Sequence, residues 1–175
     1  MLVLREFEKA DRSSIVTILN CPEVTRFLSS RIPSPYTLND ADWWLETGCK
    51  QGFVRAIEID GTFAGCISAE PGQHEHAFTG EVGYWLAPDF WRKGYAGQAL
   101  HQLLTLLPPT MFVRLQATVF QTNIASCKVL EKCGFTLETT LEKALYKRGS
   151  FHTAVLYGKL ICEDARDLNL LKRLT

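Results

Sequence analysis

A loop rich in glycine and basic residues, from Trp91 to Gly97, carries the clearest chemistry of the sequence. It reads Trp-Arg-Lys-Gly-Tyr-Ala-Gly and leads directly into an apolar pattern of helical period. A helix start presents backbone N–H groups without intrahelical partners at the positive end of the helix dipole. Phosphate groups bind well at such a site. The loop therefore predicts a binding site for a phosphate-bearing ligand.

The apolar spacing predicts the elements that position this loop. A strand over residues 77–86 precedes it, and a helix over residues 95–107 follows it and ends at Pro108. The other expected strands span residues 2–7, 53–59, 62–69, 113–119, 135–141 and 153–161, and the other expected helices span 11–19, 37–48 and 123–133, with a broken helix or loop over 23–36.

Four local signals set the boundaries of these elements. Asp11 and the pattern from Thr37 to Asp40 predict helix starts, because their side chains can accept backbone N–H groups. Asp60-Gly61 predicts a two-residue hairpin turn, which needs positive φ. Gly134 predicts a left-handed helix end. Together the elements predict one mixed α/β domain over residues 1–175, whose charged tail over 163–175 is expected to form a short helix.

Composition excludes several classes of protein. The 19 Lys and Arg residues equal the 19 Asp and Glu residues, so no overall charge attracts nucleic acid or a membrane surface. No apolar run approaches the ~18 residues of a membrane span, and the N-terminus lacks the features of a signal peptide. The six cysteines form no C-x-x-C pair and the four histidines have no metal-ligand spacing. We therefore expect a cytoplasmic protein with reduced thiols and no metal.

The element order and three motifs resemble the GCN5-related N-acetyltransferase (GNAT) superfamily, in particular its RimJ/RimL-like branch, which acetylates protein N-termini. The motifs are residues 81–86, residues 91–96, and the run from Asn123 through Ser126 to Phe135. The resemblance covers nearly the whole chain. It implies a central, mostly antiparallel twisted sheet that is splayed in the middle and has helices on both faces.

The resemblance implies acetyl-CoA as the donor of an acetyl group. The donor would lie in a V-shaped opening between the strand that ends at Leu86 and the strand that ends near Val119, where its amide-rich arm can pair with unpaired strand groups. Its diphosphate would lie on the N–H groups from Arg92 to Gly97, although the branch usually has a larger residue than Gly97. The expected contacts are Trp85, Leu86, Ala87, Trp91, Arg92, Lys93, Gly94, Tyr95, Ala96, Gly97, Asn123 and Ser126.

Acetyl transfer requires a neutral amine, and Glu81 is the expected base. A protein α-amino group has a pKa of about 8, so a modest base is enough. Alternation places Glu81 on one face with Gly83 and Trp85, near the expected opening. The alternative is an exposed carboxylate, or one that braces the structure by hydrogen bonds. A glutamate that some relatives carry near the last turn is replaced here by Leu145, which adds weight to Glu81.

The departing thiolate requires a proton donor. Many superfamily members use a tyrosine where this chain has Leu130. Ser126 is the remaining hydroxyl, and the RimL-like branch is thought to use a serine there; the alternative is a helix serine bonded to a carbonyl of its own helix. Asn123 is expected to orient the donor's arm, a role that is compatible with helix capping.

The identity of the acceptor stays open. The first hypothesis is a protein or peptide N-terminal α-amine, and the second is a small amine such as a polyamine, an amino acid or an aminoglycoside. A third is a CoA-binding sensor without turnover. Under each hypothesis we expect a monomer or a homodimer. Acidic residues expected near the acceptor do not separate the first two, because either acceptor is a cation: Glu23, Asp40, Asp42, Glu46, Glu75 and Glu81.

Overall fold

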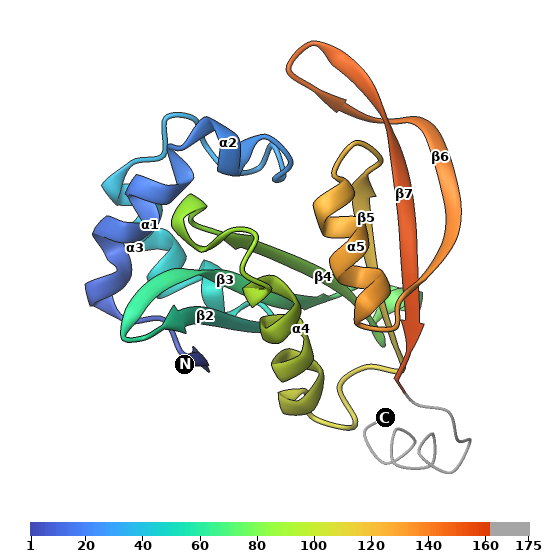
Figure 1. Cartoon of the computed structure of the whole chain (residues 1–175), viewed down its shortest axis with the longest axis horizontal. Helices are drawn as coiled ribbons and strands as arrows, with labels where there is room; N and C mark the ends of the chain where they lie inside the picture. The colour runs from blue at the N-terminus through green and yellow to red at the C-terminus, as the bar shows by residue number, and fades with distance from the viewer. Residues whose placement is uncertain (162–175) are drawn as a thin grey trace.

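A single seven-stranded sheet with helices on both faces forms the body of the protein (Figure 1). The computed structural model describes residues 1–161, so the expected helix over 163–175 lies outside the described residues. The strand order is β1-β2-β3-β4-β5-β7-β6, and every neighbouring pair is antiparallel except β4 and β5. The expected mixed α/β fold with a mostly antiparallel sheet is confirmed.

The elements follow the predicted order closely. The strands are β1 (Leu2–Arg5), β2 (Phe53–Ile59), β3 (Thr62–Pro71), β4 (Thr79–Leu86), β5 (Arg114–Phe120), β6 (Thr136–Lys147) and β7 (Ser150–Leu160). The α-helices are α1 (Arg12–Leu19), α2 (Pro22–Thr25), α3 (Leu38–Glu46), α4 (Tyr95–Leu106) and α5 (Ile124–Lys132). Strand β6 runs six residues beyond the expected end at residue 141, because a bulge in its pairing with β7 lets the ladder resume at Leu145.

Three of the four boundary signals are confirmed. The Thr37 hydroxyl accepts from the N–H of Asp40 at 3.3 Å, and Asp40 accepts from the N–H of Thr37 at 2.7 Å, which makes a reciprocal cap. Asp60 and Gly61 have φ of 49° and 77°, and Gly134 has φ of 81°. The fourth signal holds in part: α1 begins directly after Asp11, as expected, but the buried carboxylate of Asp11 accepts from Arg5 and from the N–H of Glu8 and makes no cap bond to α1.

The β4–β5 pair opens along its length. These parallel strands pair at three positions, where Thr79, Gly80 and Glu81 face residues 114–116. Beyond Glu81 the remaining residues of β4 have no recorded partner on β5, within the part of the chain that the structure describes. We call this unpaired segment the splay. It confirms the sheet opening that the family resemblance implied.

Each face of the sheet has its own apolar core. On the face covered by α4 and α5, Val82 and Leu86 of β4 pack with helix residues such as Leu100 and Leu130. On the face covered by α1 and α3, Trp85 packs against a cluster that includes Ile15. Figure 1 shows α4 and α5 in front of the sheet and α1 to α3 grouped at its β1–β3 end. The side chains of successive β4 residues therefore enter different environments.

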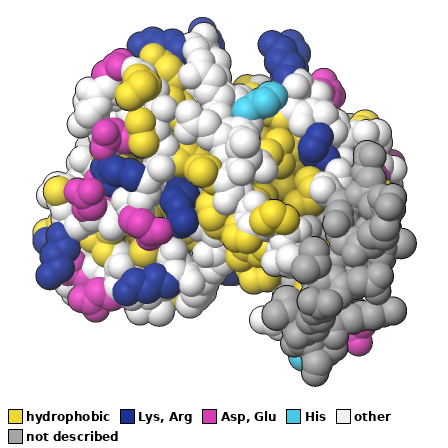
Figure 2. Space-filling view, turned by 90° about the horizontal axis from the view of Figure 1, so that it is seen from below, with side chains coloured by type: hydrophobic (Ala, Val, Ile, Leu, Met, Phe, Trp, Pro, Cys, Tyr) yellow, Lys and Arg dark blue, Asp and Glu magenta, His cyan; other side chains and the backbone are white. Residues whose placement is uncertain are grey.

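No helix within residues 1–161 has the length and apolarity needed to cross a bilayer. No three His, Cys, Asp or Glu side chains among these residues are placed to hold a metal ion together. On the face that Figure 2 shows, acidic and basic side chains are interspersed around a central group of hydrophobic side chains.

Candidate active site

Glu81 lies where the β4–β5 pairing ends, and its carboxylate replaces the next backbone hydrogen-bond acceptor of the ladder. Its Oε1 accepts from the backbone N–H of Thr118 at 2.8 Å, and its Oε2 accepts from Nε2 of Gln116 at 3.0 Å. In a continuing parallel ladder, the N–H of Thr118 would donate to a backbone carbonyl of β4 instead. The carboxylate therefore ends the ladder and leaves that carbonyl unpaired. A carboxylate has about four acceptor positions, so two bonds leave capacity for a proton.

The unpaired edge of β4 consists of backbone groups of alternate residues. The N–H of Ala87 donates to Ala64 at 2.8 Å, and the carbonyl of Thr79 accepts from Gly72 at 2.9 Å, so the odd-numbered residues of β4 face β3. The backbone groups of Val82 and Tyr84 consequently face β5. The Glu81–Gln116 pair still uses the N–H of Val82, so the unpaired groups are the carbonyl of Val82 and both backbone groups of Tyr84. Within residues 1–161 this edge is open to an extended ligand that carries amide groups.

Alternation also decides which expected contacts reach this edge. Trp85 is opposite Cys66 of β3, and its side chain packs against Phe63 with ring centroids 6.0 Å apart. The N–H of Ala87 is used by β3. The backbone groups of Trp85 and Ala87 therefore face β3 and not the unpaired edge. Leu86 lies at its end, where its carbonyl accepts from the indole N–H of Trp91 at 2.8 Å.

Two hydroxyl groups meet across the splay. The Tyr84 hydroxyl lies 2.8 Å from the Ser126 hydroxyl, and either oxygen can be the donor. Burial raises the pKa of Tyr84 well above its ordinary value, so the phenol stays protonated at neutral pH. Ser126 is thus bonded to a side chain of β4 rather than to a carbonyl of its own helix. The sequence reading missed Tyr84.

The residues around Ser126 have structural roles as well. Asn123 is the N-cap of α5, and its Oδ1 accepts from the N–H of Ser126 at 3.3 Å. Asn123 thus has the helix-capping role that the sequence suggested, and this role still allows it to contact a ligand. Leu130 is fully buried in the core beneath α5, where its apolar side chain needs no hydrogen-bond partner. The hydroxyl that meets Ser126 belongs to Tyr84 of β4.

The loop from Trp91 to Gly97 has the geometry expected of an anion site. Gly94 is the N-cap of α4 with φ of 80°, and Arg92 has φ of 60°. Among the described residues, no backbone hydrogen bond is donated by the N–H groups from Arg92 to Gly97. A Cβ placed on Gly97 would meet no atom within 4 Å, so the helix start is open. Arg92 and Lys93 are exposed beside it.

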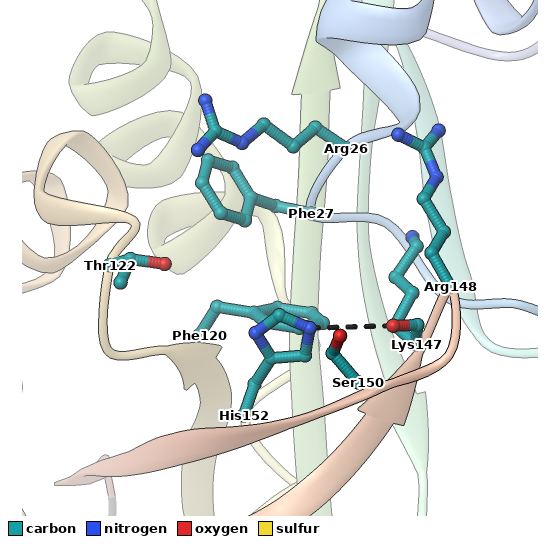
Figure 3. A pocket seen from close by; sticks show the side chains of 8 residues that line it. All are labelled: Arg26, Phe27, Phe120, Thr122, Lys147, Arg148, Ser150 and His152. Atoms are coloured by element: carbon teal, nitrogen blue, oxygen red, sulfur yellow. Dashed lines mark hydrogen bonds between the residues drawn. The ribbon is translucent and has the colours of Figure 1, made fainter.

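A cavity of about 200 Å³ lies beyond the end of β5 (Figure 3). Its walls come from the loop after α2, the β5–α5 connection and the β6–β7 turn, and comprise Arg26, Phe27, Phe120, Thr122, Lys147, Arg148, Ser150 and His152. None of the six acidic residues expected near the acceptor lines it. Asp42, for example, is paired with Arg12, which lowers the pKa of its carboxyl group.

Comparisons with known proteins agree with this arrangement. A sequence model of a protein family, described as the acetyltransferase (GNAT) domain, matches residues 1–136. The uncharacterized N-acetyltransferase YoaA of Bacillus subtilis (strain 168) is 26% identical over 169 residues, which cover 90% of this chain and 92% of YoaA.

Two solved structures have the same fold at low sequence identity. RimL, a ribosomal alpha-N-protein acetyltransferase in complex with coenzyme A, has a TM-score of 0.79 and 19% identity and covers 93% of this chain and 96% of its own. The microcin C7 self-immunity acetyltransferase MccE, in complex with acetyl-CoA and AMP, has a TM-score of 0.77 and 20% identity, with 91% and 92% of the two chains covered.

Proposed function

The chain belongs to the GNAT acetyltransferase family, and on this premise we propose that it transfers the acetyl group of acetyl-CoA to an α-amine in a ternary complex. The observation that carries the proposal is the splay. It combines an unpaired β4 edge, a carboxylate at its closed end and a hydroxyl pair beside it. Within the family we assign the chain to the RimJ/RimL-like branch, an assignment supported by Ser126 and by the fold shared with RimL.

The residues present fit acetyl-CoA. The donor's amide-rich arm would pair with the carbonyl of Val82 and the backbone groups of Tyr84, as an added strand does at a sheet edge. The free N–H groups from Arg92 to Gly97 and the positive end of α4 would hold the diphosphate. The open space beside Gly97 supports this placement. When bound, acetyl-CoA supplies a thioester carbonyl that an amine can attack.

Glu81 is the proposed base on the acceptor side. Its neighbours in the alternation are Gly83 and Trp85, and Trp85 packs toward the α1/α3 face. An α-amine with a pKa of about 8 is roughly one-tenth neutral at pH 7, whereas a lysine amine near 10.4 is almost entirely charged. A carboxylate that already accepts two hydrogen bonds is a modest base, which suits an α-amine.

Ser126 and Tyr84 are the proposed proton donors on the opposite, α4/α5 face. In the transfer, the amine nitrogen bonds to the acetyl carbon, the carbon–sulfur bond breaks, and the sulfur takes up a proton while the amine loses one. The hydroxyl pair holds a proton at the Ser126 oxygen, and the buried phenol can replace it. The proposed base, Glu81, and the proposed proton donors, Ser126 and Tyr84, therefore lie on different faces of the splay. The base can thus act on the amine while the donors act on the sulfur.

Two measurements test this function together. Acetyl-CoA should raise the melting temperature, because a ligand that binds only the folded state stabilises it. Thiol release should then be measured with peptides that have free N-termini, with amino acids, with polyamines and with aminoglycosides. Release that depends on the acceptor supports the transferase. Tight binding without release from any acceptor would favour the CoA-binding sensor, and the absence of a thermal shift would refute the donor assignment.

A further inference from the structure

The cavity at the end of β5 lies near the candidate site along the chain. Phe120, which lines it, is two residues beyond Thr118, whose N–H holds Glu81. At the rise of an extended strand this separation is about 7 Å. Thr122, also in the wall, comes directly before the N-cap of the helix that carries Ser126. An acceptor whose amine lies at the splay would therefore extend into this cavity.

The cavity lies on the opposite face of the sheet from the diphosphate loop. Side chains alternate along β5, and Leu115 and Val119 pack into the core beneath α4 and α5. Phe120 therefore shares the other face with Gln116, which is bonded to Glu81. The start of α4 belongs to the α4/α5 face, since Tyr95 packs against that core. The cations of the cavity are thus separate from those proposed for the donor.

The cavity wall is strongly cationic. It contains two arginines and one lysine and no carboxylate. Lys147 has a structural role, because its Nζ donates to the carbonyls of Thr25, at 2.8 Å, and Leu28. Among the described residues, no ion pair includes Arg26 or Arg148. Their positive charges are therefore not balanced by any carboxylate in the wall.

The remaining walls are aromatic and polar. The ring of Phe120 packs against His152, with centroids 5.4 Å apart at a steep angle, and against Phe27, with centroids 5.7 Å apart (Figure 3). Arg26 enters from the segment after α2, and Arg148 enters from the turn between β6 and β7 (Figure 3). The cavity therefore offers two guanidinium groups from separate elements above an apolar floor.

We propose that the acceptor amine carries an anionic group, a carboxylate or a phosphate, which Arg26 and Arg148 bind while Phe120 and His152 contact its apolar part. Guanidinium groups match both anions with paired hydrogen bonds. The same charges oppose a polyamine or a lysine side chain. They also favour the neutral form of the reacting amine, as the transfer requires. This inference rests on the proposed transferase function and specifies its acceptor.

The test compares acceptors with and without an anionic group. One arm uses peptides with Asp, Glu or phosphoserine as first residue against Asn, Gln or Ser, and against Lys. A second arm uses free amino acids against their α-carboxamides, because every free amino acid carries an α-carboxylate. The kcat/KM for thiol release should be roughly tenfold or more higher for the anionic member of each pair. The lysine acceptors should be the slowest. The arm with the higher values identifies whether the anion belongs to a free amino acid or to a peptide.

Arg148→Asn tests the cavity itself. Arg148 has φ of 50°, and asparagine tolerates this left-handed conformation. Lys143→Asn is the matched control, because Lys143 has φ of 53°, is exposed and is not in the wall of the cavity. Arg148→Asn should reduce the anionic-to-neutral preference by about tenfold, as should Arg26→Gln, and Lys143→Asn should leave it intact.

The outcomes separate the two proposals. Equal kcat/KM for anionic and neutral acceptors would refute the inference while confirming the transferase. A preference that Arg148→Asn and Arg26→Gln both leave intact would also refute it, since the anion would then bind elsewhere. If no acceptor in either arm causes thiol release, the proposed function is refuted, and the inference with it.

Discussion

Replacing Glu81 with glutamine or alanine separates the two roles of its carboxylate, which are to brace the splay and to accept a proton. A glutamine at this position can still accept the N–H of Thr118 through its amide oxygen. Gln116 can rotate its own amide to present oxygen to the new NH₂ group, which gives up the 3.4 Å bond that this oxygen accepts from Nε of Arg114. Glu81→Gln should therefore keep both hydrogen bonds while it removes the charge and the proton acceptor.

The size of each effect follows from these contacts. Glu81→Ala leaves the N–H of Thr118 without its partner, which costs about 1–3 kcal/mol of unfolding free energy if water does not replace it. Glu81→Gln should cost less than about 1 kcal/mol. In catalysis, loss of a positioned general base costs roughly 10²- to 10⁴-fold in kcat. The glutamine variant should thus be nearly as stable as the parent and much slower.

The pH dependence gives the second half of the test. About a tenth of an α-amine is neutral at pH 7 and about nine-tenths at pH 9, from its pKa of about 8. The need for a base falls accordingly, so the deficit of Glu81→Gln should shrink as the pH rises. Chemical denaturation and thiol release at several pH values measure both properties. A glutamine variant with normal kcat and an alanine variant impaired in stability alone would refute the base role and leave Glu81 as a brace.

Four further predictions follow from the same structure. Ser126→Ala should lower kcat while leaving the acetyl-CoA dissociation constant within about twofold, as measured by calorimetry; a normal kcat would remove its donor role. Tyr84→Phe should lower kcat in the same way, since it removes only the oxygen 2.8 Å from Ser126; an effect confined to stability would contradict this. Leu130→Ala should cost about 2–5 kcal/mol in denaturant unfolding, because Leu130 is fully buried, and a smaller loss would show that the core beneath α5 repacks. Burial raises the pKa of Tyr36 to about 12, above the value near 10 of an unfolded chain. The folded state therefore favours the protonated phenol, and the resulting stability, complete below pH 10, should be lost as the pH rises toward 12. Tyr36→Phe should flatten that part of the stability profile.

The sequence predicted the local features of the site because each depends on neighbouring residues. The helix start after Gly94, the cap at Asn123 and the position of Ser126 all follow from short motifs and helical spacing. The alternative for Glu81, a carboxylate that braces the structure, is present in its bonds to Gln116 and Thr118. Whether Glu81 is also the base stays a prediction.

The features that were missed depend on residues far apart in the chain. Tyr84 and Ser126 are 42 positions apart, and their contact requires the packing of α5 on β4. Trp85 and Ala87 were assigned to the opening because the sequence does not reveal which residues bond to β3 and which face β5. A shift of one residue in register exchanges the two sets.

The cavity was not predicted, for the same reason. Its wall joins residues 26–27, 120–122 and 147–152, which share no local pattern. Of the six acidic residues expected near the acceptor, Glu81 lies at the splay, Asp40 caps α3 and Asp42 pairs with Arg12. None of the six lines the cavity, because only the fold decides which charges meet.

Amide hydrogen exchange with and without acetyl-CoA tests the central claim most directly. The account predicts slower exchange at Tyr84 and at the N–H groups from Arg92 to Gly97, because a bound donor would occupy groups that have no partner in the described residues. Exchange at β3-bonded residues such as Ala87 should change much less. Bound acetyl-CoA that slows exchange elsewhere, and leaves both of these segments unaffected, would contradict the account.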